Sequence, residues 1–135
     1  MDDVLLNKFA SLDRFIKRIR EEYAKCDGDI ERDILRQDSI VLNIERACEQ
    51  CINMGQRLIR EKKLGMPKEY REIFTVLRER DIISKELSDD LKKMVGFRNL
   101  AIHEYRELNL EQLKYIIEHR VEQLLAFGRI LIGLK

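Results

Sequence analysis

Residues 34–58 have the sequence ILRQDSIVLNIERACEQCINMGQRL, in which small and apolar residues recur every seven positions along two columns. A seven-residue repeat lines one face of a long α-helix and packs it against other helices, in a bundle or in a dimer. The repeat predicts a helix from about residue 30 to residue 64, with Gln37 as a polar break in the second column. The columns are Ile34, Val41, Cys48 and Gly55, and Ile44, Cys51 and Leu58.

The segment before this helix also has helical spacing. Apolar residues three and four positions apart predict a first helix over about residues 3–25. The sequence Asp27-Gly28-Asp29 then predicts a turn, with Asp29 as the N-cap of the long helix. The apolar residues of the first helix are Leu5, Phe9, Leu12, Ile16, Ile19 and Tyr23.

The second half of the chain predicts three more helices. A short helix is expected over about residues 69–80, and Ser84 or Ser88 is expected to cap a fourth helix. Asn109, with Gln112 three positions later, has the spacing of a capping box and opens the last helix. We therefore predict an all-α fold, an up-and-down helical bundle of four main helices plus a short helix.

Composition supports this fold and limits the function. The 135 residues include one proline and no tryptophan, and we expect them to form a single domain over residues 1–135. With 26 basic and 25 acidic residues the formal net charge is +1, so any contact with RNA must be local. The first ten residues, MDDVLLNKFA, are unlike a signal peptide, and no window approaches the ~18 apolar residues of a membrane span. We expect a cytoplasmic protein with no membrane contact.

Two of the three cysteines, Cys48 and Cys51, have C-x-x-C spacing. A zinc site requires a second pair of ligands, and a thioredoxin-like motif requires a strand before its helix. The sequence offers neither, and both cysteines fall on the apolar columns of the long helix. We expect buried structural thiols, and no metal or cofactor.

Residues 96–105, GFRNLAIHEY, bring polar groups of several kinds to the end of an apolar helix. A histidine exchanges protons near neutral pH, so His103 is a candidate acid or base toward a ribose 2′-hydroxyl. Arg98 offers a fork of donors to a phosphate and to the charge that develops on it. Asn99 is suited to orienting the phosphate or the histidine, and Tyr105 to contacting a phosphate or carrying a modification. These groups suit RNA cleavage without a metal, since no acidic cluster for magnesium accompanies them.

The spacing of Arg98 and His103 allows a simpler interpretation. Five residues correspond to about 140° around an ideal helix, so the two side chains do not share one narrow stripe. A cleft that contains both requires a distorted helix, a long reach by the arginine, or a second subunit across a twofold axis. From spacing alone, a structural network of arginine and glutamate, with His103 at a helix C-terminus, is the alternative.

The stretch resembles the HepT-like branch of the HEPN superfamily. That branch is marked by an arginine, a polar residue, three further residues, a histidine, one residue and a tyrosine, here Arg98, Asn99, His103 and Tyr105. The helix order and the upstream Ile82-Ile83-Ser84 extend the resemblance over nearly the whole chain. The residues that lead into the motif and also resemble the family are Leu91, Met94, Gly96 and Phe97.

The resemblance implies a homodimer whose motif lines a cleft between the subunits. It implies a metal-independent endoribonuclease, the toxin of a toxin–antitoxin pair, held by a minimal nucleotidyltransferase antitoxin that attaches adenylate to the motif tyrosine, Tyr105. The alternative is a non-catalytic module that binds a nucleotide or the nucleotidyltransferase. The complete set of Arg98, Asn99 and His103 favours the nuclease, whereas the near-neutral charge favours the module.

Overall fold

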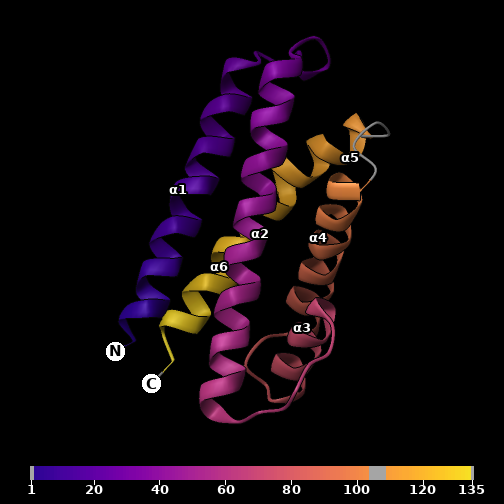
Figure 1. The fold of residues 1–135 in the computed structure, drawn as a ribbon. Coiled ribbons are helices and arrows are strands. Elements are labelled where there is room, and N and C mark those ends of the chain that lie inside the picture. Colours follow the sequence, from indigo (N-terminus) through magenta and orange to yellow (C-terminus); the bar gives the residue numbers. More distant parts are fainter. Residues whose placement is uncertain (1, 104–108, 135) are drawn as a thin grey trace.

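The computed structural model describes residues 2–103 and 109–134, apart from the side chains of residues 100–103, and every element in these ranges is helical. Figure 1 shows the main helices running alternately up and down, so the predicted all-α bundle of four main helices and a short one is confirmed. The helices are α1 (Asp3–Lys25), α2 (Ile34–Lys62), the short α3 (Tyr70–Glu79), α4 (Lys85–His103), and a last rod of α5 (Leu110–Tyr115), η3 (Ile116–Arg120) and α6 (Val121–Ile132).

Helix α2 is the centre of the bundle. It packs against α1, α3, α4 and α6, and Figure 1 shows α1 and α4 on opposite sides of it. Its predicted apolar columns are buried, with one exception: Ile34, the first residue of α2, is 67% exposed. The prediction that Ile34 is buried was wrong, because the first turn of α2 is not covered by the other helices. The buried members are Val41, Cys48, Gly55, Ile44, Cys51 and Leu58.

The start of α2 also differs from the prediction. Its N-cap is Asp33, whose carboxylate accepts a hydrogen bond from the Arg36 N–H at 3.1 Å, whereas Asp29 makes no side-chain cap. Between them, η1 (Ile30–Arg32) is a 3-10 turn. The Gln37 amide donates to the Ile30 and Glu31 carbonyls at 2.7 and 3.2 Å, so the polar break in the column secures this turn.

The remaining caps follow the sequence closely. Ser84, rather than Ser88, caps α4, because its hydroxyl accepts from the Leu87 N–H at 3.1 Å. Ser88 is buried inside α4 and donates to the Phe74 carbonyl at 3.3 Å, which ties α4 to α3. At the last rod, the Asn109 side chain accepts from the Gln112 N–H at 3.1 Å.

The π-helical turn η3 inside the last rod was not predicted. Arg120, at its end, donates to the Asp90 carboxylate of α4 at 2.7 Å, and Gln123 donates to the same carboxylate at 2.9 Å. A π turn inserts an extra residue per turn and so rotates the side chains that follow it. The turn thus lies where the last rod is fastened to the helix that carries the motif. Within the described ranges, none of the helices is long and apolar enough to span a membrane.

Candidate active site

The predicted motif lies on the last two turns of α4, at the end that rises beside α5 in Figure 1. Met94, Val95 and Phe97 are buried and fix this part of the helix against the core. Arg98 follows as a half-buried residue, and Asn99 is exposed. His103 is the last residue of α4, and its side chain is not described. Tyr105 lies outside the described residues.

Helix α4 is regular through both Arg98 and His103. The two positions therefore remain about 140° apart around the helix, and a distortion of α4 does not bring them together. Of the three routes to a common cleft, a long reach by the arginine and a second subunit remain open.

Arg98 lies between α2 and the start of α3. Its guanidinium carbon is 5.8 Å from the centroid of the Tyr70 ring. Its Nε is buried and has no hydrogen-bond partner among the described atoms. No ion pair joins Arg98 to a carboxylate of the described residues, and Glu45 of α2 is near enough to feel its charge.

The positive charge of Arg98 lowers the pKa of two groups on α2 relative to burial alone. Burial raises the pKa of Glu45, and the positive charges of Arg98 and Arg46 oppose that rise. Burial raises the pKa of the Cys48 thiol to about 12, again against the charge of Arg98. Arg98 is thus a half-buried cation whose charge acts on Glu45 and Cys48 of α2.

An open hollow of about 600 Å³ lies beside the motif, between α4 and the segment that leads into α3. Asn99 and Val95 form its α4 wall, and Lys68, Tyr70 and Arg71 face them together with Glu69. Sequence reasoning missed this second wall, because it lies almost thirty residues before the motif and only the packing of α3 on α4 joins them. The one signal in the sequence is a tyrosine flanked closely by two basic residues.

A second hollow, of about 490 Å³, adjoins the first across Arg71. Its walls come from α3, from α4 and from the last rod, and they bring Lys93 and Arg120 toward Tyr115. The larger hollow of about 650 Å³ lies at the other end of α2, next to Gly65 and Met66. That hollow does not border the motif.

Cys48 and Cys51 are free and buried, as predicted. Their sulfurs lie 3.9 Å from the Met94 carbonyl and 3.7 Å from the Leu124 carbonyl, so the C-x-x-C pair contacts α4 and α6. Among the described residues, no group of three or more histidine, cysteine or acidic side chains is placed to hold a metal ion.

Comparison with known proteins agrees with this architecture. Residues 12–130 match the family model described as Ribonuclease HepT-like. The curated mRNA nuclease HepT of Shewanella oneidensis is 42% identical over 128 residues, which covers 94% of this chain and 95% of the relative. The helical bundle and these two matches together define a HEPN-type protein. The chain belongs to the Ribonuclease HepT-like family, which confirms the resemblance read from the motif.

Solved structures show the same fold. A tri-AMPylated HEPN toxin of Shewanella oneidensis in complex with an MNT antitoxin superposes with a TM-score of 0.94 at 39% identity, covering 99% of this chain and 100% of the other. A toxin–antitoxin crystal structure with AMP-PNP gives 0.93 at 38% identity, with 98% and 100% covered. A cytosolic Bacillus subtilis protein of unknown function shares the fold alone, at 0.71 and 15% identity, with 92% and 87% covered.

Proposed function

We propose that this protein is the endoribonuclease toxin of a toxin–antitoxin pair and that Arg98, Asn99 and His103 form its catalytic site. The observation that carries the proposal is Arg98, a half-buried cation with an unpartnered Nε and no described carboxylate in an ion pair. A buried donor without a hydrogen-bond partner is costly, and a hydrogen bond to a bound phosphate offsets that cost. Family membership and the nuclease name of the relative at 42% identity support the same reading.

The reaction we propose begins with attack of a ribose 2′-oxygen on the adjacent phosphorus. The bond from phosphorus to the 5′-oxygen of the next nucleotide then breaks, which leaves a 2′,3′-cyclic phosphate and a 5′-hydroxyl. His103 transfers a proton, Arg98 stabilises the charge on the phosphorus oxygens, and Asn99 holds the phosphate in position. These groups need no metal, so we propose metal-independent cleavage.

We further propose that the active species is a homodimer. Leu35 and Leu42, seven residues apart on α2, are 82% and 43% exposed, which is unusual for leucines on one face of a helix. Glu45, three residues after Leu42, lies near enough to Arg98 to sense its charge. A second copy that covers this stripe brings two motifs together, and the second His103 then supplies separate groups for base and acid.

The regulator we propose is a minimal nucleotidyltransferase antitoxin that attaches adenylate to Tyr105. The support comes from relatives: one solved toxin is tri-AMPylated and bound to an MNT antitoxin, and another toxin–antitoxin structure contains AMP-PNP. Adenylate on Tyr105 adds negative charge two residues after His103, which repels an RNA phosphate from the motif.

Cleavage of an in vitro mRNA transcript by the purified protein tests the nuclease proposal. Arg98→Ala should lower the rate on the order of a hundredfold while leaving the helical circular dichroism unchanged. Arg18→Ala is the control, because Arg18 is an exposed arginine of α1, and α1 lies on the other side of α2 from α4 (Figure 1). A wild-type protein that binds the transcript without cleaving it would favour the non-catalytic module.

A further inference from the structure

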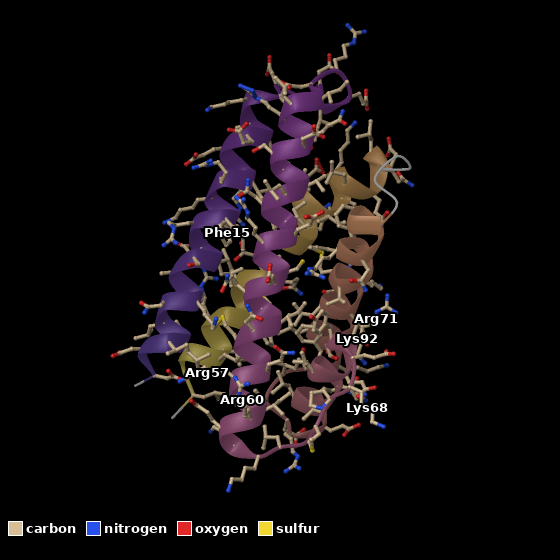
Figure 2. All side chains as sticks on the ribbon, in the orientation of Figure 1. Phe15, Arg57, Arg60, Lys68, Arg71 and Lys92 are labelled. Atoms are coloured by element: carbon tan, nitrogen blue, oxygen red, sulfur yellow. The ribbon has the colours of Figure 1, made fainter. Side chains whose placement is uncertain are left out.

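One flank of the molecule gathers basic side chains around the hollow at Asn99. Figure 2 shows Lys68, Arg71 and Lys92 on this flank, beside α3 and α4. None of the three forms an ion pair with a described residue, and Glu69 is the one acidic side chain that lines the hollow. Glu72 lies on the same segment and accepts from the Lys68 N–H at 2.9 Å, so the three basic side chains face two acidic ones here.

Tyr70 places an aromatic ring among these charges. It is 45% exposed, which is high for a large side chain on a helix that packs into a bundle. Its ring lines the hollow and also faces the Arg98 guanidinium at 5.8 Å. An exposed ring between cations is the arrangement on which proteins stack the bases of single-stranded nucleic acids.

Arg71 lies close to α4 because Gly96 has no side chain there. A Cβ atom built at residue 96 would lie 2.7 Å from Nη2 of Arg71, so the guanidinium occupies the space that a larger residue would fill. This contact puts Arg71 on the border of both hollows, one turn of α4 away from Asn99.

We propose that this hollow is a substrate subsite that holds the nucleotide next to the cleaved phosphate. Tyr70 stacks the base, while Lys68 and Arg71 bind the flanking backbone phosphates. A base on the Tyr70 ring has its own phosphate near Arg98 and Asn99, which links the subsite to the reaction. The inference rests on the proposed ribonuclease function, and it assigns to that function a set of positioning residues outside the motif.

Binding and cleavage should separate this role from a role in chemistry. The binding probe is a fluorescently labelled mixed-sequence oligoribonucleotide whose 2′-hydroxyls are methylated, so that it binds without being cleaved. Tyr70→Ala and Arg71→Ala should each weaken binding about tenfold, whereas Tyr70→Phe keeps the ring and should bind like wild type. With a cleavable transcript, Tyr70→Ala should raise KM and leave kcat nearly unchanged, as expected for uniform binding. Arg71→Ala should also lower the salt dependence of binding by about one phosphate contact.

Arg18→Ala is again the matched control and should bind the probe like wild type. If wild type cleaves the transcript while Tyr70→Ala and Arg71→Ala match it in binding and KM, the subsite is wrong and the nuclease stands. Equal weakening by Arg18→Ala would also overturn the subsite, since the effect would then be one of overall charge. Unchanged RNA binding by Tyr70→Ala with loss of nucleotidyltransferase binding would assign the hollow to the antitoxin instead. A wild-type protein that does not cleave RNA would overturn the proposed function itself.

Discussion

Arg98 holds a position that packing alone does not explain. The residues around it on α4, Met94, Val95 and Phe97, are buried and apolar, and Arg98 itself is half-buried with an unpartnered Nε. A buried donor that lacks a hydrogen bond costs stability, because it has lost its contact with water. A phosphate ligand is a physical reason to keep it.

The two cysteines of the C-x-x-C pair should be inert in the folded protein. Burial raises the pKa of Cys48 to about 12 and that of Cys51 well above its ordinary value, so neither forms a thiolate at neutral pH. Titration with a thiol reagent should leave both unreactive until the protein is denatured. Rapid reaction of either cysteine in the native state, or stoichiometric zinc in the purified protein, would contradict this assignment.

Tyr105 should be the residue that accepts adenylate. Intact-mass and peptide analysis after incubation with the nucleotidyltransferase and ATP should show adenylate on Tyr105, together with loss of RNA cleavage. Tyr70→Phe serves as the control, because it removes the hydroxyl of a partly exposed tyrosine near the motif and should leave the added mass in place. Modification confined to a residue other than Tyr105 would count against the proposal.

At the scale of elements, close approach of α2 to its neighbours depends on Gly55. A Cβ there would lie 2.6 Å from Cγ2 of Ile73, and the fully buried Phe127 and Leu77 leave Ile73 little room to move. Gly55→Ala should lower the free energy of unfolding by about 1–3 kcal/mol. This loss outweighs the gain of up to about 1 kcal/mol in helix propensity.

Urea denaturation measures this difference, and Glu49→Ala is the control because Glu49 is an exposed residue of the same helix. An unfolding midpoint for Gly55→Ala at or above that of wild type would show that α3 and α6 are free to move away from α2.

The bounds of the helices were predictable where a local sequence feature decides them. The span of α1 follows from its apolar residues at spacings of three and four, and the Ser84 and Asn109 caps follow from side chains that satisfy free N–H groups. The start of α2 was missed because Asp29 and Asp33 are both good caps, and only the 3-10 turn between them decides. The π turn η3 was missed because no local pattern marks it, and the Asp90 carboxylate to which Arg120 at its end donates lies thirty residues earlier along the chain.

Only the part of the candidate site that is continuous in sequence was predictable. Arg98, Asn99, His103 and Tyr105 lie within eight residues and form a readable pattern. Tyr70 and its basic neighbours do not, because tertiary packing alone sets them opposite Asn99.

At the scale of the whole molecule, the exposed stripe of α2 should hold the dimer together. Leu35→Glu combined with Leu42→Glu places charges on that stripe and should convert a dimer to a monomer at micromolar concentration. Sedimentation velocity measures the change. Val4→Glu is the control, since Val4 is another exposed apolar residue, 40% exposed, on α1. A wild-type monomer at this concentration would remove the composite site.

The chemistry of the cleaved ends tests the central claim most directly. Wild-type protein should cut an RNA transcript in the presence of EDTA, leave 2′,3′-cyclic phosphate and 5′-hydroxyl ends, and spare a substrate with deoxyribose at the cleavage position. His103→Ala should keep its helical circular dichroism and lose on the order of a hundredfold or more in rate. Full activity in a folded His103→Ala protein, or activity abolished by EDTA alone, would contradict the proposed mechanism.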